Sequence, residues 1–87
     1  MHEKDVVPQV APIVASVWKL EVAVGDRVEV GATLAVLESM KMEIPVFATV
    51  AGVVESIPVS PTQIVQEGDT VVVLAPQSEV PSPRAAG

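Results

Sequence analysis

The chain has 87 residues, no cysteine and a formal net charge of −6 at pH 7. A chain of this length forms one small domain with a thin core, which excludes a deep active site inside a stable scaffold. The lack of cysteine excludes disulfides and fits a reducing, cytoplasmic location. The acidic charge argues against nucleic acid and anionic membranes as partners, and no apolar run reaches the ~18–20 residues that span a membrane.

Short apolar runs separated by turn signals fill the chain between a polar leader at 1–5 and a Pro-, Ser- and Ala-rich tail at 76–87. We expect the leader to be flexible and the tail to be disordered. Valine is abundant, which favours strands, and no stretch has the length and period of an amphipathic helix. We therefore predict an all-β sandwich or barrel over residues 6–75. Its expected strands are 6–11, 14–24, 27–30, 33–37, 42–47, 53–59, 64–65 and 70–74.

Turn signals separate these strands. Gly25-Asp26, Gly31-Ala32 and Gly68-Asp69 are typical of tight turns, and Ala51-Gly52 is typical of a turn or a bulge. The descending strand 42–47 contains Pro45, which a sheet tolerates on an edge strand.

The two halves of the chain resemble each other. Val14–Val17 aligns with Val50–Val53 at an offset of 36, and Gly31–Leu34 aligns with Gly68–Val71 at an offset of 37. This alignment places one inserted residue between the two matches. Each half alone would leave one sheet face wet, so the repeat predicts a pseudo-twofold unit of two copies of four strands that fold together.

The stretch from Glu38 to Glu43 fits a two-residue β-hairpin with Met40 and Lys41 at its tip. Such turns need positive φ at both central residues, which costs a non-glycine residue roughly 1–2 kcal/mol each. Facing glutamates are also mildly unfavourable. Residues that are this unfavourable for the local turn structure indicate that the positions serve a function. The expected register pairs Ser39 with Met42, Glu38 with Glu43, Leu37 with Ile44 and Val36 with Pro45.

Lys41 is the candidate working residue of this hairpin. An ordinary solvated lysine in a relaxed loop is the simpler interpretation of a lone lysine at a turn. Two methionines on either side of it, Met40 and Met42, are harder to explain in that way, because methionine is usually a core filler or a contact residue.

The motif Glu38-Ser39-Met40-Lys41-Met42-Glu43 resembles the attachment motif of biotinyl domains, whose usual form is Glu-Ala-Met-Lys-Met. On this resemblance the chain is identified as a member of the biotin/lipoyl attachment family, similar to biotin carboxyl carrier proteins and to small stand-alone biotinylated proteins. Related lipoyl domains carry Asp-Lys-Ala or similar, so the flanking methionines favour biotin. The resemblance implies a barrel-sandwich hybrid, a flattened β-barrel of two four-stranded antiparallel sheets. It places the modified lysine on a hairpin at one end and the termini near the other.

The resemblance also implies a cofactor and partners. Biotin would be attached covalently to Lys41 by a biotin protein ligase that makes biotinyl-adenylate, with Glu38, Met40, Met42 and Glu43 as recognition contacts. The arm would then carry CO2 from a biotin carboxylase subunit to a carboxyltransferase subunit. The carrier is expected to be a monomer and not to be an enzyme alone, since no general acid, metal cluster or nucleophile–base pair is visible. A lipoyl-type acyl carrier and an unmodified interaction module that docks through the hairpin remain open alternatives.

Two departures from the family pattern put local turn geometry in doubt. The first half of the family pattern usually has glycine where Ala15 stands, and the second half usually has Gly-Asp where Pro61-Thr62 stands.

Overall fold

The computed structural model describes residues 6–76, and every regular element in that range is a strand. The expected leader and residues 77–87 of the expected tail lie outside the described residues. No helix within 6–76 is long and apolar enough to cross a membrane. The strands are β1 (Val7–Val10), β2 (Ala15–Leu20), β3 (Arg27–Val28), β4 (Thr33–Ser39), β5 (Met42–Phe47), β6 (Gly52–Ser56), β7 (Ile64–Val65) and β8 (Thr70–Pro76).

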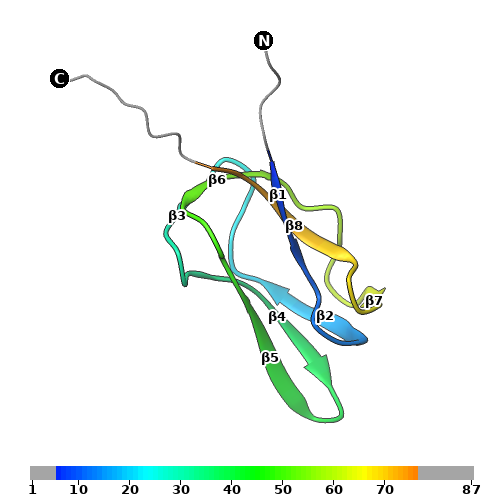
Figure 1. Ribbon diagram of the computed structural model, residues 1–87. Coiled ribbons are helices and arrows are strands. Elements are labelled where there is room, and N and C mark those ends of the chain that lie inside the picture. The colour runs from blue at the N-terminus through cyan, green and yellow to red at the C-terminus, as the bar shows by residue number, and fades with distance from the viewer. Residues whose placement is uncertain (1–5, 77–87) are drawn as a thin grey trace, which may run out of the picture.

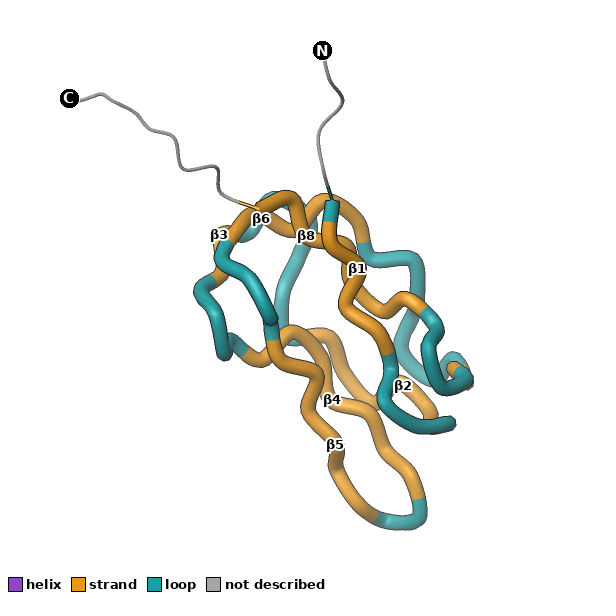
Figure 2. The backbone as a smooth tube through the Cα atoms, in the orientation of Figure 1, coloured by secondary structure: helices purple, strands orange, loops and turns teal. Residues whose placement is uncertain are grey.

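The strands form two four-stranded antiparallel sheets (Figure 1). Sheet A has the order β1-β8-β6-β3, and sheet B has the order β5-β4-β2-β7. The prediction of an all-β barrel-sandwich hybrid is confirmed. The β4–β5 hairpin projects from one end of the body, while β1 begins and β8 ends at the opposite end (Figures 1 and 2).

A pseudo-twofold relates the two halves. Exchanging β1 with β5, β2 with β6, β3 with β7 and β4 with β8 converts the strand order of one sheet into that of the other. The pair Val17–Leu37 in β2 and β4 corresponds to Val54–Leu74 in β6 and β8, 37 positions later. The predicted repeat is therefore confirmed.

The inserted residue expected within the repeat is wrong. Ala15 pairs with Val65 in the same way that Gly52 pairs with Val28, so the 37-residue offset already holds at the start of β2. Similarity between the two Val-Ala dipeptides favoured an offset of 36 there. Cross-strand pairing decides the alignment, because slipping a strand by one residue would turn its buried face outward.

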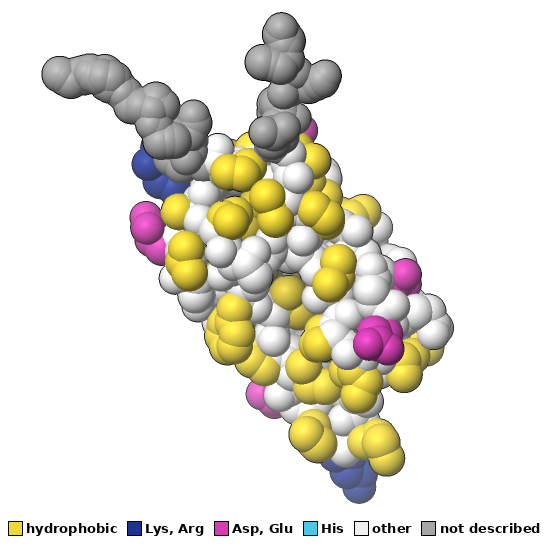
Figure 3. Space-filling model, viewed as in Figure 1, with side chains coloured by type: hydrophobic (Ala, Val, Ile, Leu, Met, Phe, Trp, Pro, Cys, Tyr) yellow, Lys and Arg dark blue, Asp and Glu magenta, His cyan; other side chains and the backbone are white. Residues whose placement is uncertain are grey.

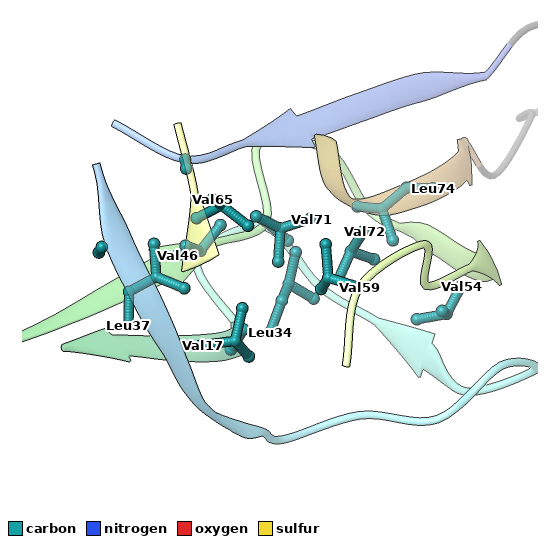
Figure 4. Packing of buried hydrophobic residues seen from close by; sticks show 14 of the residues in the cluster. Val17, Leu34, Leu37, Val46, Val54, Val59, Val65, Val71, Val72 and Leu74 are labelled. Atoms are coloured by element: carbon teal, nitrogen blue, oxygen red, sulfur yellow. The ribbon is translucent and has the colours of Figure 1, made fainter. Parts of the chain in front are cut away.

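The core lies between the two sheets and is aliphatic. Leu34, Leu37 and Leu74 are its largest fully buried side chains. Burying each is worth roughly 1.5–3 kcal/mol, so these residues and the valines around them hold the two sheets together. Figure 4 shows the packed cluster, in which the labelled residues are Val17, Leu34, Leu37, Val46, Val54, Val59, Val65, Val71, Val72 and Leu74.

Gln9 is the buried polar exception in this core. Its Oε1 accepts a hydrogen bond from the backbone N–H of Thr49 at 3.0 Å, and its Nε2 donates to the carbonyl oxygens of the two preceding residues at 3.3 and 3.4 Å. The pseudo-twofold places Val46 at the position of Gln9 and Pro12 at the position of Thr49. Because Pro12 has no N–H, the residue equivalent to Gln9, Val46, needs no hydrogen-bond acceptor in its side chain.

β2 is shorter than expected, because the alternating run 14–24 leaves sheet B part-way. Glu21 N–H donates to Leu34 O at 2.9 Å, which ends its pairing with sheet B. Gly25 N–H then donates to Val54 O in sheet A at 2.9 Å. A single alternating pattern therefore continues beyond the strand of sheet B, which periodicity alone does not reveal. β3 and β6 also end earlier than expected, at Val28 and Ser56, and β8 extends to Pro76.

Gly52 lies in β6, not in a turn. A Cβ at this position would lie 2.2 Å from the Ala75 carbonyl oxygen and 2.9 Å from both the Ala75 carbonyl carbon and the Pro76 Cα. All three atoms belong to backbone, so they cannot yield as a flexible side chain would. The glycine is required by the close approach of β8.

The predicted glycine turns are present, with Gly25, Gly31 and Gly68 at φ of 97°, 90° and 89°. The fourth equivalent turn aligns Thr62-Gln63 with Gly25-Asp26, so the expected match at Pro61-Thr62 is one residue off. Its geometry is nevertheless the same. Thr62 adopts φ of 73°, and Gln63 Oε1 accepts from the Ser60 N–H at 3.0 Å, as Asp26 Oδ2 accepts from the Ala23 N–H at 2.9 Å.

Candidate functional site

The β4–β5 hairpin has the predicted two-residue turn. Met40 has φ of 53° and Lys41 has φ of 68°, so both occupy the left-handed region that non-glycine residues rarely adopt. The strand register matches the prediction at every pair. Pro45 lies on β5, which is an edge strand of sheet B, as expected for a proline inside a strand.

The base of the hairpin is anchored in the body. Leu37 is fully buried and pairs with Ile44, which packs partly buried against the core. The next residue, Glu38, still pairs on its other side with Ser16 of β2, whose Oγ–H donates to the Glu38 carbonyl oxygen at 3.5 Å. Beyond this point the hairpin has no second neighbouring strand, so its tip stands clear of the fold.

The side chains at the tip are exposed. Met40 and Met42 are 90% and 62% exposed, and Lys41 is exposed between them. Figure 3 shows basic side-chain atoms at the end of this projection, with apolar side chains behind them. Because the methionines contribute little to the core, their apolar surface is available to a partner.

The other two motif residues also stay in solvent. Glu38 and Glu43 are exposed and face each other across the hairpin, as predicted. Within residues 6–76 the Lys41 amine makes no ion pair or hydrogen bond, whereas the Lys19 amine pairs with Glu21 at 3.4 Å. The Lys41 Nζ lies at the end of a flexible four-carbon stem and is therefore accessible to a reaction partner.

The chemistry open to this site is that of one primary amine. A deprotonated lysine amine is a nucleophile that forms an amide with an activated carboxyl group. In the described part of the chain, no group of three or more His, Cys, Asp or Glu side chains is placed to hold a metal ion. The Lys41 amine is thus a group to which a cofactor with a carboxyl group could be joined covalently.

The sequence profile of a protein family described as biotin-requiring enzyme, the biotin/lipoyl family, matches residues 6–74. The chain belongs to this family. It is similar to "Biotinylated protein TB7.3 homolog" of Mycobacterium leprae (strain TN), with 49% identity over 65 residues that cover 75% of this chain and 92% of that one. It is also similar to "Biotin carboxyl carrier protein" of Streptococcus mutans serotype c (strain ATCC 700610 / UA159), with 42% identity over 65 residues that cover 75% and 50% of the two chains.

Among solved structures, the chain is similar to Kluyveromyces lactis urea carboxylase, with a TM-score of 0.78 and 34% sequence identity. The match covers 85% of this chain and 6% of the carboxylase, so the family domain corresponds to a small part of that large enzyme. Biotin is the covalent cofactor of this attachment domain, and the recognition made from the hairpin motif is confirmed.

Two exposed apolar side chains outside the hairpin were not singled out from the sequence. Trp18 was assigned only to a strand, and Ile64 only to a short one. The signal that could have found them is a comparison of the two halves at the 37-residue offset, which aligns them with the charged residues Glu55 and Arg27.

Proposed function

We propose that this protein is a biotin carboxyl carrier in which Lys41 bears the biotin. One observation carries the assignment: the only lysine of the hairpin lies at its exposed tip, in a left-handed conformation that is strained for a non-glycine residue. The family match and the biotinylated relatives support the choice of biotin.

Attachment needs an activated biotin from another protein. In this proposal a biotin protein ligase binds the hairpin and presents biotinyl-adenylate to Lys41. The Lys41 Nζ attacks the acyl carbon, an amide bond forms, AMP leaves, and the amine proton passes to solvent. The exposed Met40 and Met42 side chains offer apolar contacts to the ligase, and Glu38 and Glu43 offer charged ones.

The carrier works by proximity. Attached biotin supplies the group that accepts CO2 at a biotin carboxylase and releases it at a carboxyltransferase. The anchored base of the hairpin keeps Lys41 at one end of the domain. The tether therefore raises the effective concentration of the attached biotin at the partner's active site. A cytoplasmic location remains a prediction from the cysteine-free sequence.

The proposed monomeric state is supported by the sheet edges. Exposed edge strands can pair with a second chain. Pro45 on β5 and Pro8 on β1 occupy equivalent positions and each lacks the N–H that such pairing needs. The other two edges, β3 and β7, have two residues each. All four sheet edges in the described chain are therefore poor templates for strand addition.

Intact mass and peptide mapping test the proposal. The full chain is incubated with a purified biotin protein ligase, biotin and ATP. The expected result is a single biotin adduct on the peptide that contains Lys41, and no adduct on Lys41→Arg. A lipoyl adduct in cells that make both cofactors, or a biotin adduct that persists in Lys41→Arg, would contradict it.

A further inference from the structure

The outer face of sheet B is continuous from β7 to the hairpin. Strand register places Ile64, Ser16, Glu38 and Glu43 in one row across all four strands. Ile64 and Ser16 lie on the outer face, because their neighbours Val65 and Ala15 are buried on the inner one. A partner that contacts the Glu38–Glu43 pair can therefore extend along this face without leaving it.

Trp18 and Ile64 form an exposed apolar patch on this face. Trp18 is the extra residue of a bulge in β2 and is 46% exposed, while Ile64 is 66% exposed. Ile64 pairs with Ser16, two residues before Trp18, so the two apolar residues lie diagonally across β2 and β7. The Lys19 amine lies 5.0 Å from the centroid of the Trp18 ring, which adds a basic group at the border of the patch.

The other half of the domain provides an internal control for this patch. Glu55 is the extra residue of the matching bulge in β6, at the position equivalent to Trp18. Arg27 of β3 is equivalent to Ile64 and is likewise exposed. The same backbone therefore carries charged side chains at both positions, so packing does not demand the tryptophan and the isoleucine. An exposed apolar pair that the fold does not need is available for contact with a partner.

The patch is close enough to the hairpin for one partner to cover both. Neighbouring strands are about 4.8 Å apart, so Ile64 lies roughly 10 Å from Glu38 across two strand spacings. Lys41 lies three residues beyond Glu38, roughly another 10 Å. An interface of standard size buries about 800 Å² per partner, which is roughly 30 Å across. A partner of ordinary footprint that reaches Lys41 can therefore also cover Trp18.

We propose that the Trp18–Ile64 patch is a docking surface for the ligase that attaches biotin to Lys41. This inference rests on the proposed function. The ligase must bind the domain before any biotin is present, so its affinity has to come from the protein surface, whereas the carboxylase partners can also bind the biotin arm. The proposal predicts that the ligase has an apolar pocket for Trp18 and Ile64, beside basic groups that complement Glu38 and Glu43.

The double substitution Trp18→Glu and Ile64→Arg tests the inference. It gives sheet B the residues that the other half already carries at these positions, so bulge and strand geometry are retained, and the net charge stays at −6. The control is Val10→Gln on the outer face of sheet A, where Val10 is 43% exposed and the charge is also unchanged. The readout is the initial rate of biotin incorporation against the concentration of the full chain, with thermal unfolding measured in parallel.

We expect the KM of the ligase for the double variant to rise about 10-fold or more, with kcat and the unfolding temperature nearly unchanged, because a buried tryptophan anchor typically carries at least this much of the binding energy. The control should match the parent. Equal kcat/KM for the double variant and the parent would overturn the inference while leaving Lys41 as the biotin site. Normal ligation combined with a loss of CO2 transfer in a complete carboxylase would also overturn it, by assigning the patch to that enzyme. If the ligase attached no biotin to the parent chain, the proposed function itself would be contradicted.

Discussion

Replacing Met40 by asparagine should stabilise the domain and weaken biotin attachment. Met40 has φ of 53° and is 90% exposed, so its side chain adds strain and little packing. Asparagine tolerates the left-handed region and is preferred at this turn position, which relieves about 1 kcal/mol of the roughly 1–2 kcal/mol cost. For a domain of 60–100 residues, this corresponds to a rise in the unfolding temperature of about 4–8 °C.

Two measurements on three variants test this trade-off. Thermal or urea unfolding reports stability, and the initial rate of biotin incorporation by the ligase reports function. Thr62→Asn is the control for strain relief, since Thr62 has φ of 73° and is exposed away from the tip, and it should gain similar stability. Met40→Leu is the control for the apolar contact, because leucine retains both the strain and the hydrophobic surface. It should leave stability unchanged and retain most of the ligation rate.

The reasoning would be refuted by a Met40→Asn variant that is no more stable than the parent while Thr62→Asn gains stability. It would also be refuted by a Met40→Asn variant that is biotinylated as fast as the parent. The first result would mean that the tip is not strained, and the second that the thioether is not a ligase contact.

Three further single substitutions, one of them followed by a second-site change, have outcomes that the structure specifies. Lys41→Arg should unfold like the parent yet give no streptavidin signal after ligation, and a signal would contradict the site. Gly52→Ala should lower stability by more than about 2 kcal/mol in urea unfolding, because its Cβ would meet backbone atoms of Ala75. Gln9→Met should cost about 1–3 kcal/mol by leaving the Thr49 N–H without its acceptor. Adding Thr49→Pro should recover part of that loss, and a strictly additive double variant would show that this hydrogen bond is not the cause.

Much of the site could be predicted from the sequence because it is local. A two-residue turn at Met40-Lys41 between two apolar runs fixes one register, in which Leu37 pairs with Ile44. A two-residue connection then requires positive φ at the tip. No contact from elsewhere in the chain is needed to place Lys41 in solvent, so the turn, its register and its exposed lysine are all as predicted.

The repeat was visible in the sequence, but its register was not. Ala15 is identical to Ala51, so sequence similarity favours the offset of 36 at this strand, although the correct offset is 37. The structure decides for Gly52, since β8 approaches β6 so closely there that no Cβ fits. Likewise, the 14–24 run alternates throughout, yet it leaves sheet B after Glu21, and the next residue after the run, Gly25, bonds to sheet A.

The sequence by itself determined an all-β domain built from two similar halves and a lysine held out on a strained hairpin, because strand alternation and turn chemistry act between neighbours in the chain. Only the tertiary structure decided which strands pair, why Gly52 and Gln9 stand where they do, and that Trp18 and Ile64 share an outer face with the hairpin. Those features depend on contacts between residues about 20 to 50 positions apart, whose partners no local pattern specifies.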